Sequence, residues 1–378
     1  MKLSKSINIL FFVFILNCTN NNTESTSKEN FDETIKNGLS ETKVIDVNVL
    51  EITEFFETGA SQSMAWGNDH LIITDFNENQ LLLLSLNGDL IHKTGKYGKG
   101  PGEFESISQL YRGPDETLYV LDLLLRRINK YKVSNQNLEY LTTFIPEPEE
   151  HYYLMDVYAT ENGNYAVFNH VLDYQQTGEN VNYLYLMDED FQPVKKILEL
   201  PGENKTQMDI GFFIQHPLPN KMLWTLENGF FYTLNSHSTT IRKRNMLTGE
   251  TEEFKYMPDY IRINTRATTD FFLERLDPII KVVPKAYDAI VESETLPLNQ
   301  SLLVQGNWII IKTIYAGGES GTIIFVNQNS GKAYYGNVPP HFSAFSMIDN
   351  SLIGIDFTDL DNVQVKRITF DPDAFDTF

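Results

Sequence analysis

Short apolar segments recur in this chain at an interval of 47 residues. Asp75 and Asp122 close equivalent apolar segments 47 residues apart, and Asn169 closes a third segment after another 47. In the first two units the next apolar segment begins six residues past the aspartate, at Leu81 and Ile128. A period in the forties with three or four short strands in each unit indicates a β-propeller, in which every unit forms one blade.

The units read as strands separated by turn residues. The segment 70–95 holds three apolar runs, with Asn87 and Gly88 between the last two, and Asn-Gly between apolar runs predicts a hairpin. The segment 117–144 repeats this layout. Later units are expected over 229–254, 308–336 and 351–370, so that six units of about 45 to 50 residues account for the folded length.

The predicted fold is therefore all-β, a single six-bladed β-propeller over residues 43–378. We expect the outlying strand 44–56 to complete the last blade, because an open ring would leave strand edges unpaired. The segment 266–294 has a helical pattern interrupted by Pro278 and Pro284, and we expect it to be an insertion between blades. A β-sandwich would not explain the spacing, and a parallel α/β fold needs helices between its strands.

The start of the chain has the layout of an export signal. Lys2 and Lys5 precede the apolar run 7–16, which is too short to span a bilayer and is followed by Cys18, the only cysteine. The segment resembles a bacterial lipoprotein signal, in which the cysteine becomes the acylated N-terminus. We therefore expect a signal peptide over residues 1–17 and lipidation of Cys18.

Two further features bear on this anchor. Asn17 stands where such signals usually carry Gly, Ala or Ser, so an ordinary secretory signal stays open as the alternative. Residues 18–42 are polar and lack periodicity, which predicts a flexible tether. The expected location is the cell envelope, as an outer-membrane lipoprotein facing the periplasm or the cell surface, tied to the membrane only through its lipid.

Charge and cysteine content exclude several function classes. The formal charge is −21, and it becomes −23 when Lys2 and Lys5 are removed with the signal. This acid excess argues against nucleic-acid binding, since phosphates need Lys and Arg. With Cys18 acylated no thiol is left, which excludes disulfides, cysteine nucleophiles and cysteine-ligated zinc. The 25 Phe and 19 Tyr suit a β-rich core.

The segment 95–104 resembles the connector between blades of NHL-repeat propellers, and of bacterial six-bladed β-propeller lipoproteins in particular. Such repeats read aspartate, two residues, asparagine, one residue, arginine and isoleucine. Asp122, Arg127 and Ile128 match this pattern, with Leu125 in place of the asparagine. The resemblance implies a six-bladed propeller carried by an exported bacterial lipoprotein, and it implies no shared reaction.

The residues that could carry chemistry lack a catalytic pattern. The glycine-rich segment 95–102 contains Pro101, which removes an amide, and no helix start follows it, so a phosphate-binding loop is not expected. The seven histidines are scattered and no nucleophile elbow around serine occurs. Asp75 and Asp122 end equivalent strands, where aspartate is expected to accept backbone amides. We predict no catalytic residue and no metal site.

One acidic segment leaves calcium open. Asp356, Asp359, Asp361 and Asn362 lie close together in sequence, and calcium prefers such oxygen ligands. Their spacing is not that of an EF-hand, so an acidic hairpin tip is the preferred interpretation. No cofactor is expected other than this alternative.

Candidate ligand-binding residues follow from the geometry of propellers. The innermost strands line the centre of the ring, and the loops that enter them form one rim, where a ligand can bind. We expect these inner strands at 61–66, 106–110, 153–158, 212–216, 302–305 and 342–347. The polar or aromatic residues in or just before them, predicted to contact a ligand, are Gln62, Lys99, Glu103, Tyr152, Gln215 and His341.

The expected function is non-catalytic. We predict a lipid-anchored envelope binding or scaffold protein that uses one propeller rim to hold a peptide, a glycan or a partner envelope protein, and that is a monomer unless it joins a complex. In the scaffold variant the insertion 266–294 is the docking element. The alternative is a propeller enzyme, a metal-dependent lyase or hydrolase with a site in the central channel, which rests on analogy between folds.

Overall fold

The computed structural model describes the strands and most connectors of the chain. The described residues are 47–50, 60–67, 69–75, 78–148, 152–173, 179–203, 205–207, 213–215, 220–256, 299–313, 321–338, 342–348, 351–356 and 364–369. They form 26 strands and include no helix long and apolar enough to cross a membrane. The predicted signal peptide 1–17, tether 18–42 and insertion 266–294 lie outside the described residues.

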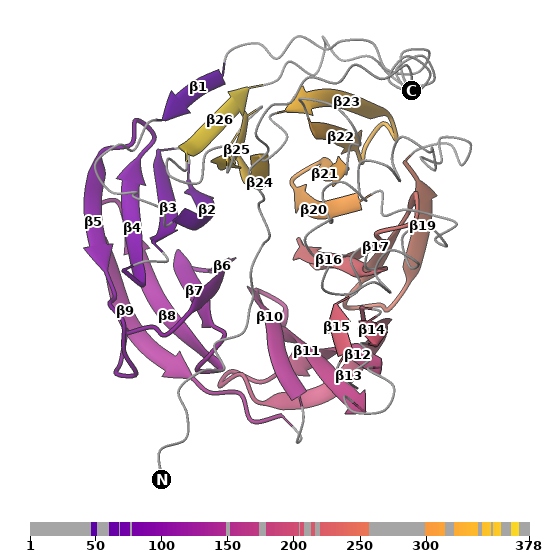
Figure 1. The fold of residues 1–378 in the computed structure, drawn as a ribbon, viewed down its shortest axis with the longest axis horizontal. Helices are drawn as coiled ribbons and strands as arrows, with labels where there is room; N and C mark the ends of the chain where they lie inside the picture. Colours follow the sequence, from indigo (N-terminus) through magenta and orange to yellow (C-terminus); the bar gives the residue numbers. More distant parts are fainter. Residues whose placement is uncertain are drawn as a thin grey trace.

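Six four-stranded antiparallel sheets are arranged as blades around a common centre, which confirms the predicted all-β six-bladed propeller (Figure 1). The first blade contains β2 (Ala60–Trp66), β3 (His70–Asp75), β4 (Gln80–Ser85) and β5 (Leu90–Thr94). The second contains β6 (Ile107–Gly113), β7 (Thr117–Asp122), β8 (Arg127–Ser134) and β9 (Asn137–Phe144). The third contains β10 (Tyr152–Thr160), β11 (Gly163–Asp173), β12 (Glu179–Met187) and β13 (Pro193–Pro201).

The remaining blades follow the same order from the centre outward (Figure 1). The fourth contains β16 (Met222–Glu227), β17 (Phe230–Asn235), β18 (Thr240–Asn245) and β19 (Thr251–Lys255). The fifth contains β20 (Asn299–Gln305), β21 (Trp308–Thr313), β22 (Gly321–Asn327) and β23 (Ala333–Val338). The sixth contains β24 (Phe342–Ile348), β25 (Ser351–Asp356) and β26 (Gln364–Thr369), with β1 (Val47–Leu50) at its outer edge.

The N-terminal strand closes the ring. β1 pairs antiparallel with β26, with Val47 opposite Ile368 and Leu50 opposite Val365. This confirms that the segment before the first blade completes the last one. The pairing covers a strand edge that would otherwise be open and ties the two ends of the propeller together.

The hydrophobic core lies between neighbouring blades. Leu71 and Ile73 of β3 pack with Ile353 of the sixth blade, whereas Ile72 between them packs with Val120 of the second blade. Successive residues of a strand point to opposite faces, and both faces of each blade are covered by a neighbour. This is why the middle strands are continuous apolar runs, each of whose buried side chains contributes about 1.5–3 kcal/mol.

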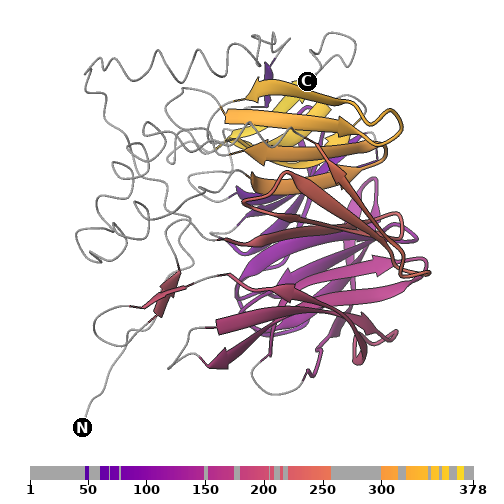
Figure 2. The same cartoon turned by 90° about the vertical axis from the view of Figure 1, so that its right-hand side faces the viewer.

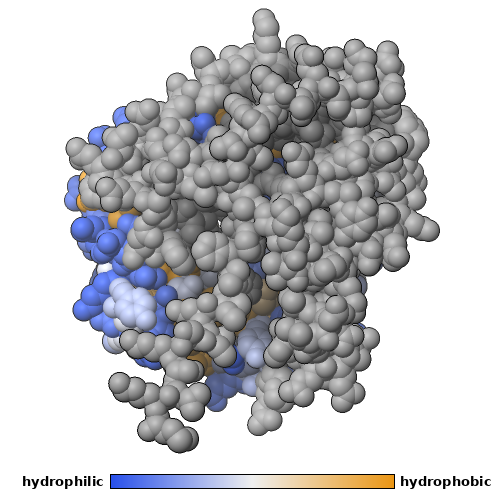
Figure 3. All heavy atoms as spheres, in the orientation of Figure 1, coloured by the Kyte–Doolittle hydropathy of each residue, from blue (hydrophilic) through white to orange (hydrophobic). Residues whose placement is uncertain are grey.

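The outer edge of the ring is more polar than its core. Where described residues are visible in Figure 3, the outer edges of the first two blades are mainly hydrophilic. The burial pattern of β9, the outer strand of the second blade, agrees, because most of its residues are exposed or half-buried.

A β-bulge recurs near the start of the inner strands. In each of the first three blades one residue is skipped in the pairing between the first and second strands. Such a bulge bends the strand and changes the direction of the side chains that follow. The skipped residues are Ser61, Ser108 and Met155, and the residues after them are Gln62, Gln109 and Asp156, all at intervals of 47.

The inner strand of the fourth blade was predicted wrongly. It is β16, and not the segment 212–216. Phe213–Gln215 forms β15, which pairs only with β14 (Lys205–Gln207) in a separate two-stranded hairpin. Figure 2 shows this hairpin set apart from the blades on one side of the ring. The sequence leading to this blade carries extra residues, so the 47-residue interval no longer locates the strand.

Candidate functional site

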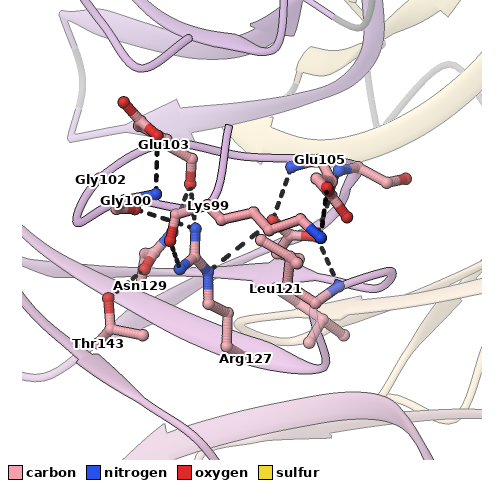
Figure 4. A network of polar contacts seen from close by, with 12 residues as sticks. Lys99, Gly100, Gly102, Glu103, Glu105, Leu121, Arg127, Asn129 and Thr143 are labelled. Atoms are coloured by element: carbon pink, nitrogen blue, oxygen red, sulfur yellow. Dashed lines mark hydrogen bonds and ion pairs between the residues drawn. The ribbon is translucent and has the colours of Figure 1, made fainter. Parts of the chain in front are cut away.

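The connector between the first two blades is organised around Glu103 (Figure 4). The Glu103 carboxylate accepts the N–H of Gly100 at 2.7 Å and pairs with Lys96 Nζ at 3.0 Å. These two contacts hold the pKa of Glu103 below its usual value, the Gly100 hydrogen bond being the larger cause. A Cβ at Gly98 would lie 2.2 Å from Glu103 Oε2. The connector therefore needs a glycine where the carboxylate folds back over it.

Arg127 fixes the same connector from below. Its guanidinium donates to the carbonyl oxygens of Lys99 at 2.7 Å, Gly100 at 3.1 Å and Glu103 at 2.7 Å. The side chain is buried, and Figure 4 shows it under the loop. A planar guanidinium presents several donors at once, which suits a cluster of carbonyl oxygens. Arg127 thus holds the connector through the carbonyl oxygens of its backbone. This gives a structural role to the arginine of the NHL-like pattern.

Asp122 has the structural role that the sequence predicts. Its carboxylate accepts the N–H groups of Glu105 at 2.9 Å, Ser106 at 3.2 Å and Leu125 at 3.1 Å. Burial raises its pKa, and these hydrogen bonds oppose the increase. Asp75, at the equivalent position of the first blade, accepts a backbone N–H three residues later at 3.2 Å. Both aspartates therefore order connectors by accepting backbone amides.

The acidic segment predicted as a possible calcium site begins at Asp356. Asp356 ends β25, is buried, and forms an ion pair with Lys366 on β26. Asp359, Asp361 and Asn362 lie outside the described residues. Within the described ranges no group of three or more His, Cys, Asp or Glu side chains is placed to hold a metal ion. Calcium binding therefore stays the alternative to an acidic hairpin tip.

The structure separates the predicted ligand-binding residues. Lys99 and Glu103 share one connector, where the Lys99 side chain is 75% exposed and lies 3.4 Å from Glu105. Tyr152 begins β10 in the third blade and is 8% exposed. Its ring stacks on that of His170, with 4.3 Å between the ring centroids. Gln62 lies on β2 and Gln215 on β15, and the positions of their side chains are outside the description, as is His341 entirely.

An exposed aromatic and basic pair lies next to Tyr152. The ring of Tyr153 is 42% exposed, and the guanidinium carbon of Arg126 lies 4.5 Å from its centroid. Arg126 belongs to the turn between β7 and β8, which also exposes Leu124. We call Leu124, Arg126 and Tyr153 the rim patch. The turn that carries Arg126 lies at the rim where the inner strands begin, because the end of β7 pairs with the start of the inner strand β6. Tyr153 lies at the same rim, since it is the second residue of the inner strand β10.

A second cluster lies deeper, between the inner strands of three blades. The Asp156 carboxylate on β10 accepts a hydrogen bond from the Tyr111 hydroxyl on β6. Its other oxygen accepts the indole N–H of Trp224 on β16 at 2.5 Å. Tyr158, two residues along β10, also hydrogen-bonds the carboxylate and lies edge-on to Tyr111, with ring centroids 5.3 Å apart. We call these four residues the axial cluster.

The environment of Asp156 disfavours its charged form. Burial raises its pKa to about 7, and hydrogen bonds from Trp224 and Tyr158 only partly oppose this. The pKa of Tyr158 is raised in turn by burial and by the neighbouring carboxylate. The carboxylate is enclosed by its neighbours, although Asp156 as a residue keeps intermediate exposure. Strongly perturbed carboxyl groups of this kind concentrate at functional sites.

Sequence reasoning missed Asp156, although a signal was present. Asp156 is 94 residues, or two repeat intervals, beyond Gln62, which was predicted as a ligand contact. The bulge preceding both residues places them at the same register position of their inner strands. Extending Gln62 through the repeat would have found Gln109 and Asp156.

Comparison with protein families agrees with this geometry. A model for the family described as "6-bladed beta-propeller" matches residues 17–217. The chain belongs to this family. A search of curated proteins found no significant match to this propeller. Its assignment therefore specifies the architecture and leaves the ligand to be inferred from the site.

Solved structures share the fold at low sequence identity. A Bacteroides fragilis protein described as exported has a TM-score of 0.53 and 12% identity, over 87% of this chain and 98% of that chain. A luciferin-regenerating enzyme gives 0.48 and 13%, over 88% and 97%. A virginiamycin B lyase from Staphylococcus aureus gives 0.43 and 12%, over 86% and 99%. Similarity at this level shows the fold alone, because one fold hosts many functions.

Proposed function

We propose that this propeller is an exported binding protein, an outer-membrane lipoprotein that holds a peptide, glycan or partner protein on the rim patch without catalysis. The observation that carries the proposal is the pairing of exposed Tyr153 with Arg126 at 4.5 Å. Tyrosine and arginine are enriched among the residues that dominate binding energies. An exposed ring preordered by a guanidinium presents a contact surface at small entropic cost.

The surroundings of the pair support a binding surface. Leu124 is 67% exposed in the same turn as Arg126, which adds exposed apolar area to this turn. The turn is anchored by the hydrogen bond from the Leu125 N–H to the buried Asp122 carboxylate, at 3.1 Å. Because the turn is fixed by this contact, the rim patch is offered on a rigid frame, which favours affinity.

The N-terminal sequence supports the location. The apolar run and Cys18 resemble a lipoprotein signal, and the Bacteroides fragilis protein of the same fold is described as exported. A Cys18→Ala variant is expected to leave the membrane fraction when cells are fractionated. Continued membrane association of this variant would contradict the lipid anchor and leave the binding proposal standing.

The binding proposal is tested with the full chain on peptide and glycan arrays. Tyr153→Ala and Arg126→Ala are expected to weaken the strongest array ligand about tenfold or more, as truncation of a central contact residue does. Leu247→Ala, which is 72% exposed in the turn between β18 and β19, is the matched control and should leave binding unchanged.

Two results would overturn it. Binding that is equally strong in the Tyr153 and Leu247 variants would remove the rim patch from the proposal. Turnover of an array ligand would replace binding by the alternative of a lyase or hydrolase, and metal analysis of the purified protein would then be the next step.

A further inference from the structure

The axial cluster contains a buried carboxylate that lacks a cation. Asp156 accepts hydrogen bonds from Tyr111 and Trp224, both of them neutral donors. Among the described residues no Lys, Arg or His forms an ion pair with it, and no positive charge contributes to its pKa. A carboxylate removed from water normally has a paired cation or becomes protonated. The site therefore lacks a counter-ion whenever the carboxyl group is ionised.

The walls around this carboxylate are aromatic. Tyr111 on β6 and Trp224 on β16 direct their hydroxyl and indole N–H groups at the carboxylate, and Tyr158 on β10 lies beside it. An organic cation that reached Asp156 would neutralise the carboxylate, and the aromatic side chains beside it would add apolar contact.

The neighbouring charges do not supply that cation. Arg112, one residue beyond Tyr111, lies over the Trp66 ring at 4.9 Å. It also acts electrostatically on Glu227, three residues beyond Trp224, whose pKa burial raises. Arg112 thus serves a separate pair of groups nearer the ends of the inner strands. Among the described residues, the groups that hydrogen-bond Asp156 are Tyr111, Tyr158 and Trp224.

Three members of the cluster are partly exposed. Asp156, Tyr111 and Trp224 all keep intermediate exposure, although they lie on innermost strands. The bulge at Met155 changes the direction of the strand just before Asp156, so that its side chain contacts both flanking blades. In the first two blades the same register position holds the neutral Gln62 and Gln109. The third blade alone of these three places a carboxylate there.

We infer that the axial cluster binds the ammonium group of a ligand, supplied either by a free diamine or by a lysine side chain of a peptide. The inference deepens the proposed binding function, because it names the chemistry of a ligand that reaches the centre of the ring. It rests on residues distinct from the rim patch. Failure of one proposal is therefore distinguishable from failure of the other.

The test uses the purified full chain and calorimetric titration at pH 8. The probes are cadaverine, a short lysine peptide with blocked ends, and the same peptide with its lysine acetylated. Binding of cadaverine alone would assign a free diamine, and stronger binding of the lysine peptide would assign a peptide. The acetylated peptide should not bind, because it lacks the charge. Binding of neither amine would overturn the inference.

Asp156→Asn is expected to weaken amine binding at least tenfold, since asparagine keeps the shape and loses the charge. Glu139→Gln, which removes an exposed carboxylate from β9, is the matched control and should change affinity less than twofold. Equal losses in both variants would indicate a general charge effect and overturn the site.

A measurement on the unmodified protein covers the case in which the Asp156 variant does not fold. Affinity for the amine is expected to fall about tenfold between pH 8 and pH 6, as the carboxyl group with a pKa of about 7 becomes protonated. Unchanged affinity over this interval would contradict a role for Asp156. The Tyr153→Ala variant should bind the amine normally, whatever its effect on the array ligand.

Discussion

The hydroxyl of Ser346 accepts a hydrogen bond at 2.8 Å from the backbone N–H of Ala65, which is 281 residues away. This contact joins the inner strand of the sixth blade to that of the first. A comparable contact joins the fifth and sixth blades, where the Gln305 side chain bonds both backbone groups of Met347, at 2.5 and 2.7 Å. Side chains thus occupy the inner edges that no further strand can pair.

Replacing Ser346 by alanine is expected to lower the free energy of unfolding by about 1–2 kcal/mol, because the buried Ala65 N–H would lose its acceptor. Urea denaturation measures the change. Ser330→Ala, in the exposed turn before β23, is the control and should stay within about 0.5 kcal/mol. Similar values for the two variants would show that the contact does not stabilise the ring.

Arg127→Lys is expected to cost about 2–3 kcal/mol. A lysine ammonium cannot reach the three carbonyl oxygens that the guanidinium binds, so buried acceptors would be left unpaired. The control is Arg242→Lys, which alters an exposed ion pair with Glu253 and should cost no more than about 0.5 kcal/mol. Equal losses of stability would refute the structural role of Arg127.

Gly98→Ala is expected to displace the Glu103 carboxylate, because the new Cβ would lie 2.2 Å from Oε2. Displacement breaks the hydrogen bond from the Gly100 N–H. In a double-mutant cycle, Gly98→Ala should cost at least about 1 kcal/mol less in a Glu103→Ala background. Additive costs, measured by thermal and urea unfolding, would mean that the two positions do not interact.

Asp156 should make stability depend on pH. Its folded pKa of about 7 exceeds the unfolded value, so the native state holds the proton more tightly. The stabilisation from this proton is complete below about pH 4 and is lost as the pH rises through about 7.

Asp156→Asn removes this dependence, since asparagine does not titrate. The stability of the variant relative to the original protein should therefore rise between pH 4 and pH 8, by an amount on the order of a few kcal/mol. Unfolding curves at several pH values measure the difference. A difference that stays constant over this range would show that Asp156 is not buried as a carboxylate. Saturating amine should stabilise the original protein at pH 8 and not at pH 5.

Much of the fold was predictable because it depends on local pattern. The interval joining Asp75 to Asp122 marks two strand ends, and at both the aspartate accepts backbone amides of the following connector. The same reasoning failed for the fourth blade. The segments 212–216 and 222–227 are similarly apolar, and only pairing with β17 shows that the second is the inner strand.

The candidate site was less predictable. Lys99 and Glu103 were found as rim residues, but the contacts show that Glu103 turns back onto its own connector. The sequence pointed to Tyr152 as a ligand contact, whereas Tyr153 is the exposed residue of the two. Sequence does not say which of two adjacent tyrosines in a strand faces the neighbouring blade. Strand alternation assigns opposite faces, and the bulge two residues later alters the assignment.

The sequence by itself determined the repeat, the number of blades and the closing strand, because these follow from periodic apolar runs and turn residues. Only the tertiary structure decided which side chains meet at the centre. Asp156 joins Tyr111 and Trp224, at separations of 45 and 68 residues, across two boundaries between blades. The repeat interval can mark the position of Asp156 on its strand, but its partners depend on the curvature of the ring, which no local pattern encodes.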